Sequence, residues 1–280
     1  MTLVDTAELV DAAHRRRGAV AALNVITLEH AEAIVDAAAA TQSALIMQIS
    51  ENAVRYHKGR LAPLAAATAA LARDAPVPVA LHLDHVTDDA LLRSAFELPF
   101  SSVMYDAGAL PHAENVERTR RAATAGHAAG LWVEAELGYV GGKPDAPQSA
   151  HAAGVRTDPD EAASYVRDTG VDALAVAVGS SHAMTTRTAR LDVELIAVLR
   201  ERVPVPLVLH GSSGVPDDEL RAAVATGIAK VNVGTALNVA MTAAVRDALA
   251  DPDLVDPRKY LAPGRDAMTA AVRRVLEILR

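Results

Sequence analysis

The sequence predicts an α/β protein that folds as a single (β/α)8 barrel over residues 1–280, with an additional C-terminal helix. Three observations lead to this prediction: the chain has 280 residues, 51% of them are hydrophobic, and short β-rich runs alternate with helical patterns throughout. Repeated strand–helix units without a break in composition are typical of a closed barrel of parallel strands. A doubly wound parallel sheet is the alternative fold, because a strand count alone does not show that the sheet closes.

Eight runs of the sequence are candidate strands, and most of them are continuously apolar rather than alternating. Such runs are typical of parallel strands, which are covered on both faces. In chain order the candidates are Ala19–Val25, Ala44–Ser50, Pro78–His85, Ser101–Ala107, Leu131–Gly138, Ala173–Gly179, Pro206–Gly211 and Ile228–Gly234.

The stretches between these runs are rich in alanine and have the length of helices. The clearest are Glu29–Ala40, Ala62–Arg73, Ala113–Ala129 and Asp217–Thr226. A final helix is expected at Arg265–Leu279, after the proline-containing segment Asp256–Pro263. This alternation of strand and helix is what a barrel with an outer ring of helices requires.

Charge and composition exclude several classes of protein. The formal net charge of −8 argues against a general nucleic-acid surface, although it allows a local basic pocket. Because the chain has no cysteines, a metal would need histidine and carboxylate ligands. The N-terminal segment lacks the apolar region of a signal peptide, and no apolar stretch is long enough to cross a bilayer. We therefore expect a cytoplasmic protein that binds neither nucleic acid nor membrane.

Three of the ten histidines lie at the predicted C-terminal ends of strands. They are His85, His182 and His210, and the carboxylates of Glu136 and Asp106 lie at the ends of two further strands. All these ends share one face of a parallel barrel, where the catalytic residues of this fold collect. One such histidine alone is explained as a hydrogen-bonded core residue, but three imidazoles with an open coordination position are typical of catalytic zinc. Nitrogen and oxygen ligands also accept other divalent metals.

Two glycine-containing turns predict an anion site near these histidines. Gly211–Gly214 precedes a helix, and Val231–Thr235 leads directly into the last helix of the barrel. Backbone N–H groups at helix N-termini bind anions, and the loops after strands seven and eight are the usual phosphate position in such barrels. Either turn alone could serve only to shape the chain, but their pairing on adjacent strands favours a phosphate site.

The motifs that carry these residues resemble those of the class II fructose-bisphosphate and tagatose-bisphosphate aldolases. The matching strings include LHLDH, SVMYDAGALPHAEN, TGVDALAVAVGSSH, PLVLHGSSGVPD and KVNVGTAL, in the order and spacing of the family. The resemblance runs from about Asn24 to the final helix, nearly the whole chain. It implies a zinc-dependent lyase that reversibly cleaves a ketose 1,6-bisphosphate to dihydroxyacetone phosphate and an aldehyde phosphate. Fructose 1,6-bisphosphate is the leading candidate, and tagatose 1,6-bisphosphate is the alternative.

The resemblance also implies roles for individual residues. The zinc ligands would be His85, His182 and His210, with Glu136 as an additional carboxylate and Asp106 near an alternative metal position. The substrate and phosphate contacts would be Asn24, Ser50, Gly211, Ser213, Asn232, Thr235 and Arg258. Because the family's arginine at the last of these positions is lent by a neighbouring subunit, a homodimer or homotetramer is implied. The resemblance also allows a monovalent cation near the phosphate.

Proton transfer is expected from two aspartates. Asp84 resembles the acid/base that exchanges a proton with the C4 hydroxyl, and a neighbouring dication would keep it ionised. The family moves the C3 proton with a glutamate on a lid, for which we take the aperiodic segment Tyr139–Asp158, with a disordered surface insertion as the alternative. Here Pro144 stands at the glutamate position, so we assign this step to Asp145. The alternative is a catalytically weak sugar-phosphate-binding protein on the same scaffold.

A second departure follows His182, where the family has glycine and this chain has Ala183. The added methyl matters only if this backbone needs a positive φ or a very close approach. Further along, we interpret Arg187 as an ordinary solvated arginine, with an anion contact as the alternative. A zinc hydrolase barrel is a further possible function, but hydrolysis of a small amide would not need the paired phosphate turns.

Overall fold

The computed structural model describes residues 3–138, 140 and 156–280, and it confirms the closed barrel. Each strand is parallel to its two neighbours, and β1 pairs with β8 to close the sheet. The doubly wound alternative is therefore wrong. The strands are β1 (Val20–Asn24), β2 (Leu45–Ser50), β3 (Val79–Val86), β4 (Ser102–Tyr105), β5 (Trp132–Leu137), β6 (Ala173–Val176), β7 (Leu207–Leu209) and β8 (Ile228–Val233).

Several strands end earlier than the sequence predicts. β6 ends at Val176 rather than Gly179, and β7 ends at Leu209 rather than Gly211. The two glycines have φ angles of 121° and 67°, which extended strands do not contain. The chain thus leaves the sheet before these residues, and the predicted functional residues lie at or just beyond the strand ends.

Alternate residues of each strand face two different apolar layers. Residues such as Leu23, Leu81 and Leu174 pack with the surrounding helices in one large core. Residues such as Ala22 and Ala80 belong to a second, smaller cluster that fills the inside of the barrel. Because both faces of the strands are covered, successive positions must be apolar, which explains the continuous runs in the sequence.

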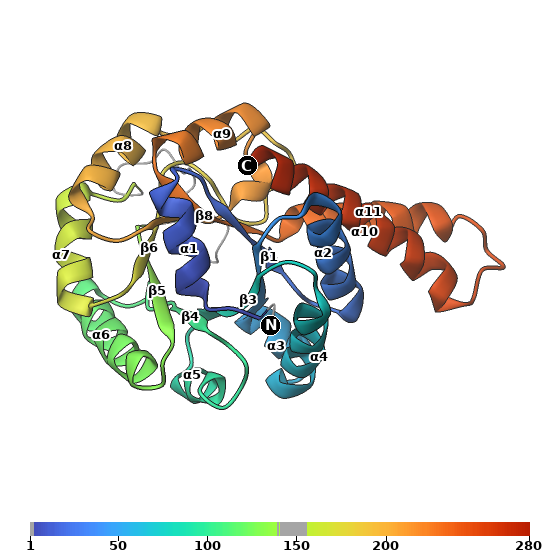
Figure 1. Ribbon diagram of the computed structural model, residues 1–280, viewed down its shortest axis with the longest axis horizontal. Helices are drawn as coiled ribbons and strands as arrows, with labels where there is room; N and C mark the ends of the chain where they lie inside the picture. The colour runs from blue at the N-terminus through green and yellow to red at the C-terminus, as the bar shows by residue number, and fades with distance from the viewer. Residues whose placement is uncertain (1–2, 139, 141–155) are drawn as a thin grey trace.

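An N-terminal helix that the sequence analysis did not assign closes one end of the barrel. Figure 1 shows α1 (Thr6–Arg15) lying across the strands, and its Val10 and Ala13 are fully buried in the interior cluster. The hydroxyl of Thr6 lies 2.6 Å from that of Ser102, the first residue of β4. Since this end is sealed at the N-terminal ends of the strands, the C-terminal mouth is the one that offers room for a ligand.

The outer ring contains the predicted helices, each within one residue at both ends. Its members are α2 (Leu28–Thr41), α3 (Glu51–Tyr56), α4 (Leu61–Asp74), α5 (Asp89–Ala95), α6 (His112–Ala128), α7 (Pro159–Thr169), α8 (Val193–Arg202) and α9 (Asp217–Thr226). No helix in the described part of the chain is both long and apolar enough to span a membrane.

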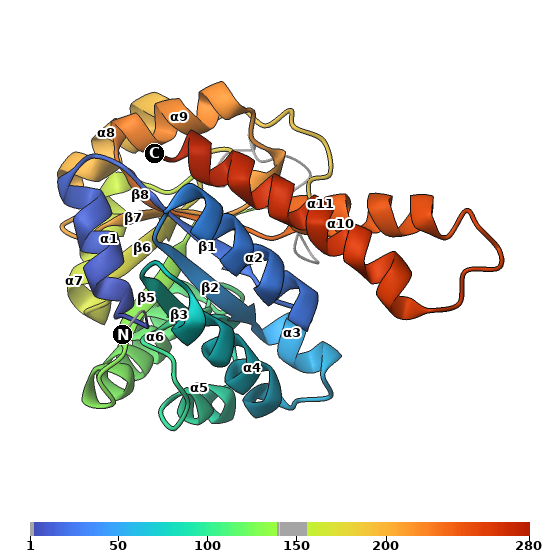
Figure 2. The same ribbon diagram turned by 45° about the vertical axis from the view of Figure 1, so that its right-hand side comes forward.

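The last two helices form a hairpin that projects from the barrel, with α10 (Thr235–Ala248) beside α11 (Pro257–Ile278) (Figures 1 and 2). The prediction that the final helix begins at Arg265 is therefore wrong. Pro257 occupies the first turn, where a missing N–H costs nothing, and Asp256 caps the helix by accepting the N–H of Arg258 at 3.0 Å. The helix then continues through Pro263, which in sequence resembled part of a connecting segment.

Candidate metal centre and anion site

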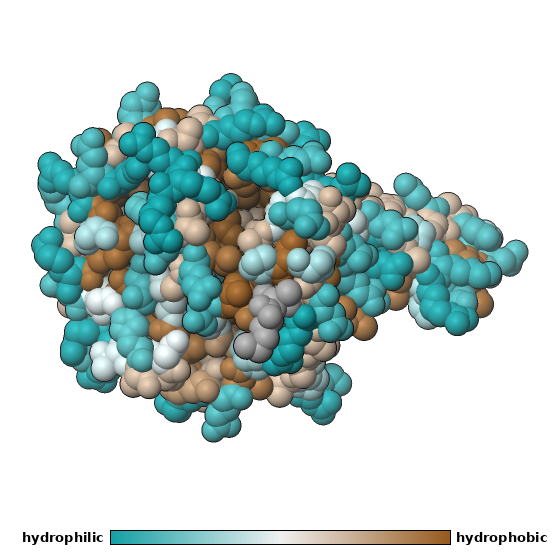
Figure 3. Space-filling model, in the orientation of Figure 1, coloured by the Kyte–Doolittle hydropathy of each residue, from teal (hydrophilic) through white to brown (hydrophobic). Residues whose placement is uncertain are grey.

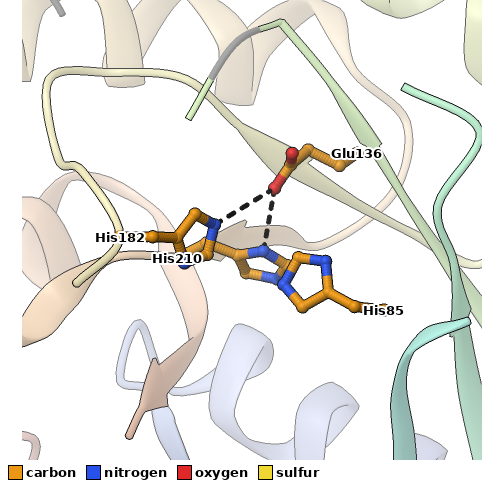
Figure 4. Close-up of side chains that lie close together, drawn as sticks. All are labelled: His85, Glu136, His182 and His210. Atoms are coloured by element: carbon orange, nitrogen blue, oxygen red, sulfur yellow. Dashed lines mark ion pairs between the residues drawn. The ribbon is translucent and has the colours of Figure 1, made fainter. Parts of the chain in front are cut away.

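Four side chains on or just after four different strands converge at the C-terminal mouth of the barrel. His85 belongs to β3 and Glu136 to β5, while His182 follows β6 and His210 follows β7 directly. One candidate ligand atom of each lies within 4.8 Å of the others, and Figure 4 shows the three rings and the carboxylate gathered together. Three imidazoles with one carboxylate form a ligand set that suits zinc.

Carboxylates outside the cluster orient two of the rings. His210 Nε2 lies 2.9 Å from Glu134 Oε1, and His85 Nδ1 lies 3.0 Å from Asp106 Oδ2. Because a carboxylate only accepts, these nitrogens carry protons, and the other nitrogen of each ring faces the cluster (Figure 4). Such contacts fix the tautomer and direction of a metal-binding histidine. Asp106 thus lies behind His85 rather than among the four converging groups.

The carboxylates in and around the cluster favour positive charge on its histidine rings. Burial lowers the pKa of His210, but the carboxylates of Glu134 and Glu136 outweigh it and raise this pKa to about 9. Burial also tends to lower the pKa of His85, but the larger effect of Asp84 and Asp106 raises it above its ordinary value. A divalent cation would compete with these ring protons, so metal binding is expected to release protons and to weaken at low pH.

His85 has a backbone conformation that non-glycine residues seldom adopt. Its φ is 52°, and the pairing register of β3 with β4 shifts between Leu83 and Val86. A positive φ costs about 1–2 kcal/mol for such a residue, and bulges next to active sites re-aim side chains. In a regular strand, Asp84 and His85 would point to opposite faces. The irregularity lets both side chains face the mouth of the barrel.

A buried polar network inside the barrel supports the cluster from below. Lys230 Nζ lies 2.8 Å from Glu134 Oε2 and 2.8 Å from Asn232 Oδ1, and all three residues are buried. Burial opposes ionisation of Glu134, but Lys230 and His210 hold its pKa at about 2. Glu134 is therefore a fixed anion that holds the ring of His210, while Lys230 holds the amide of Asn232.

Asp84 is buried beside the histidines and remains ionised. Burial raises the pKa of this carboxyl, but the nearby histidines, His85 most strongly, hold the pKa well below its ordinary range. Its Oδ1 accepts a hydrogen bond from Asn232 Nδ2 at 3.4 Å, and its Oδ2 accepts one from Gln48 Nε2 at 3.3 Å. The carboxylate is thus held in one orientation from two sides.

The turns after β7 and β8 lie next to each other, as the sequence predicts. Ser213 Oγ accepts the N–H of Ala236 at 3.0 Å, which joins the first turn to the start of α10. This helix begins after Gly234 without a side-chain cap, so its end suits an anion. A Cβ on Gly211, whose φ is 67°, would lie 2.6 Å from the carbonyl carbon of Ser181, so the first turn requires glycine.

A cleft of about 930 Å³ joins the histidine cluster to these turns. The predicted residues that line it are Asn24, Ser50, Asp84, His85, Asp106, Glu136, His182, Gly211, Ser213, Asn232 and Thr235. His210 lies just beneath, fully buried. Arg258 does not line the cleft, because it lies at the start of α11 on the projecting hairpin and pairs with Asp256. Asp145 lies outside the described residues.

The structure shows the backbone conformation of Ala183 and the contacts of Arg187, the two residues discussed above that follow His182. Ala183 has a φ of 58°, so the backbone that the family forms with glycine does adopt the left-handed conformation here. Arg187 is exposed, as the sequence analysis interprets it, and it is also held by two neighbours. Its guanidinium donates to the carbonyl of Val215 at 2.7 Å and pairs with Asp217, so it ties the loop after β6 to the segment after β7.

The sequence analysis assigns no role to Glu134 or to Lys230. A signal was available, because side chains two apart in a strand share a face. Glu134 therefore shares the face of Glu136, and Lys230 shares that of Asn232. A lysine within an apolar strand is also seldom fully buried unless it is paired, which points to a carboxylate partner.

The molecule is thus a (β/α)8 barrel in which a cluster suited to a divalent metal lies beside a turn suited to an anion. The family model described as class II fructose-bisphosphate aldolase matches residues 4–280. The chain therefore belongs to the class II fructose-bisphosphate aldolase family. It is an aldolase, a carbon–carbon lyase, and the hydrolase alternative is not favoured.

Individual relatives agree with this assignment. The chain is 39% identical over 275 residues to a fructose-bisphosphate aldolase of Geobacillus stearothermophilus, covering 97% of this chain and 95% of that protein. It is 36% identical over 300 residues to a fructose-bisphosphate aldolase of Thermus caldophilus, covering 99% and 97%. Among solved structures, the YdjI aldolase of Escherichia coli K12 superposes with a TM-score of 0.85 at 31% identity, covering 99% of this chain and 97% of that one.

Proposed function

We propose that this aldolase reversibly cleaves fructose 1,6-bisphosphate to dihydroxyacetone phosphate and an aldehyde phosphate. The observation that carries the proposal is the placement of one ionised aspartate, Asp84, in a cleft that also holds a metal-suited cluster and a phosphate-suited turn. Two relatives with nearly full coverage bear the name fructose-bisphosphate aldolase. Tagatose 1,6-bisphosphate, which differs in configuration at C4, is the alternative substrate, and the names of these relatives do not favour it.

The residues of the cluster fit a divalent metal. His182 Nε2 and His210 Nδ1 are buried, and both are turned toward the carboxylate of Glu136. A carboxylate oxygen of Glu136 lies 4.0 Å from the first nitrogen and 2.9 Å from the second. We assign zinc, the general cofactor of this family, to these three residues and His85, although the donor set also accepts other divalent ions. When bound, the metal supplies a Lewis acid that stabilises negative charge developing on the three-carbon fragment.

Cleavage of the C3–C4 bond requires a base at the C4 hydroxyl. Asp84 takes this proton as the C4 carbonyl forms, and the bonding electron pair stays on C3. Gln48 and Asn232 each donate to one oxygen of Asp84 and so hold it in place. In the synthetic direction the same carboxyl returns the proton. The turn at Gly211–Ser213, with the start of α10, holds the phosphate of the dihydroxyacetone half by backbone N–H groups and hydroxyls.

A second proton must reach C3 after the bond breaks. We assign this transfer to Asp145, because a prolyl ring at position 144 cannot move a proton. Both positions lie outside the described residues, and the support for this assignment is the order of residues in the sequence.

We also propose a homodimer or homotetramer in which Arg258 of a neighbouring subunit reaches the distal phosphate. Arg258 lies on the projecting hairpin, well placed to extend beyond its own barrel (Figures 1 and 2). The hairpin also exposes the apolar residues Val239, Leu249 and Val255, and Figure 3 shows apolar patches among hydrophilic side chains there. Exposed apolar surface of this kind favours an interface. A monovalent cation near the phosphate and a cytoplasmic location stay predictions.

The test is an assay of the zinc-loaded protein with fructose 1,6-bisphosphate and with tagatose 1,6-bisphosphate, each with and without a chelator. We expect release of dihydroxyacetone phosphate that the chelator abolishes, with the fructose substrate cleaved faster. Faster cleavage of the tagatose substrate would replace the proposed substrate. A zinc-bound protein that cleaves neither would contradict the proposed function.

A further inference from the structure

The charges of the cleft present a problem for the proposed substrate. Its described lining contains four carboxylates, those of Glu51, Asp84, Asp106 and Glu136, and Arg55 is the one arginine or lysine in that lining. A ketose bisphosphate brings two phosphate groups, each strongly anionic near neutral pH. The turn at Gly211–Ser213 supplies backbone N–H groups for one of them. In the proposed assembly the second phosphate meets Arg258 of a neighbouring subunit, and a cation of the same chain would add to that contact.

Arg55 is positioned for this role by the short segment after β2. Ser50 ends this strand and caps α3 by accepting the N–H of Ala53 at 3.2 Å, which brings the chain around the rim of the cleft. Arg55 lies near the end of the helix and lines the cleft, with its side chain 65% exposed. In the barrel order, β2 is separated from β7 by β8 and β1, so Arg55 approaches the cleft from a different part of the rim than the turn after β7.

A buried carboxylate holds Arg55 at the rim. Glu51 is buried and accepts the N–H of Thr87 at 2.6 Å and its hydroxyl at 3.0 Å. The same carboxylate pairs with one terminal nitrogen of Arg55, one turn further along the helix. A guanidinium has five N–H donors, so this single contact leaves most of them for another acceptor. Glu51 thereby fixes the side chain without using its capacity to bind an anion.

We propose that Arg55 is a specificity-determining residue that binds the distal phosphate of the ketose bisphosphate from within the same chain. This inference rests on the proposed function and deepens it. Arginine suits the task because its planar fork donates two parallel hydrogen bonds to phosphate oxygens. The cleft then selects substrates with an anion at both ends, and part of this selection does not depend on a neighbouring subunit.

The test compares fructose 1,6-bisphosphate with fructose 1-phosphate, which yields the same dihydroxyacetone phosphate but lacks the distal phosphate. The quantity measured is the ratio of kcat/KM for the two substrates. We expect Arg55→Ala to lower this ratio by about 10- to 100-fold, the range for a hydrogen bond to a charged group. Arg55→Lys, which keeps the charge but not the fork, should lower it less. The matched control is Arg60→Ala, which changes an exposed arginine outside the cleft lining and should leave the ratio unchanged.

The outcomes separate this inference from the proposed function. An unchanged ratio in Arg55→Ala would overturn the inference while wild-type cleavage still supported the aldolase. An equal loss of kcat/KM on both substrates would also overturn it, because Arg55 would then act only through the shape of the rim. A wild-type protein that cleaves neither substrate would remove the proposed function itself, and the inference with it.

Discussion

Replacing Lys230 by methionine tests the network that supports the metal centre. The side chain of Lys230 is fully buried, and its ammonium contacts Glu134 and Asn232, both at 2.8 Å. Methionine has a similar length but no charge. The variant therefore keeps most of the packing and leaves the carboxylate of Glu134 buried without its cation.

The expected loss of stability follows from the charge of Glu134. Its pKa of about 2, against the ordinary 4.5, corresponds to about 3 kcal/mol of the free energy of unfolding. Because this pKa is lowered by folding, the stabilisation is present above about pH 4.5 and is lost as the pH falls toward 2. Breaking a buried ion pair costs about 3–5 kcal/mol in general. We expect Lys230→Met to destabilise the protein by about 3–4 kcal/mol near neutral pH.

Urea unfolding provides the assay, because the one tryptophan, Trp132, is buried inside the barrel and reports on its opening. The double variant Lys230→Met with Glu134→Gln removes both charges and should recover at least about 1 kcal/mol of the loss. Lys259→Met, on the exposed surface of α11, is the matched control. A loss below about 1 kcal/mol in Lys230→Met, or no recovery in the double variant, would show that Lys230 does not stabilise the buried charge of Glu134.

Three further predictions concern the mouth of the barrel. Ala183→Gly should raise the free energy of unfolding by about 1 kcal/mol, because it relieves a positive φ. The control Ala129→Gly, at a negative φ, should not raise it. A lower free energy of unfolding in Ala183→Gly would show that the backbone of Ala183 is not strained. Asp84→Asn should lower kcat by about 10²–10⁴-fold while the bound metal, measured by elemental analysis, is retained; near-normal turnover would exclude Asp84 as the base. Gly211→Ala should raise KM for fructose 1,6-bisphosphate about tenfold or more, because the new Cβ would meet Ser181, and an unchanged KM would show that this turn does not hold phosphate.

The barrel was predictable because its strands are buried on both faces and therefore read as continuous apolar runs. The positions of the strand ends were not predictable, since residues such as Ala177 and Val178 remain apolar and buried after β6 has ended. The start of α11 was misplaced because Pro257 and Pro263 resemble helix breakers, whereas one lies in the first turn and the other within the helix.

The convergence of His85, His182 and His210 was predictable, because the C-terminal ends of parallel strands share one face. The pairing of Glu134 with Lys230 was not predictable, because these residues lie on β5 and β8, which are not neighbouring strands. Only the closed geometry shows which side chains meet across the interior. The exposed position of Arg55 likewise gave no signal in the sequence, where it follows an ordinary helical spacing of four from Glu51.

We propose that one metal, held by the histidine cluster, supports the cleavage reaction. The most direct measurement determines zinc per chain and release of dihydroxyacetone phosphate from fructose 1,6-bisphosphate in the same preparations of wild type and His210→Ala. We predict about one zinc ion and rapid release for the wild type, and neither for the variant. Full zinc content together with wild-type turnover in His210→Ala would show that the histidine cluster does not hold the catalytic metal.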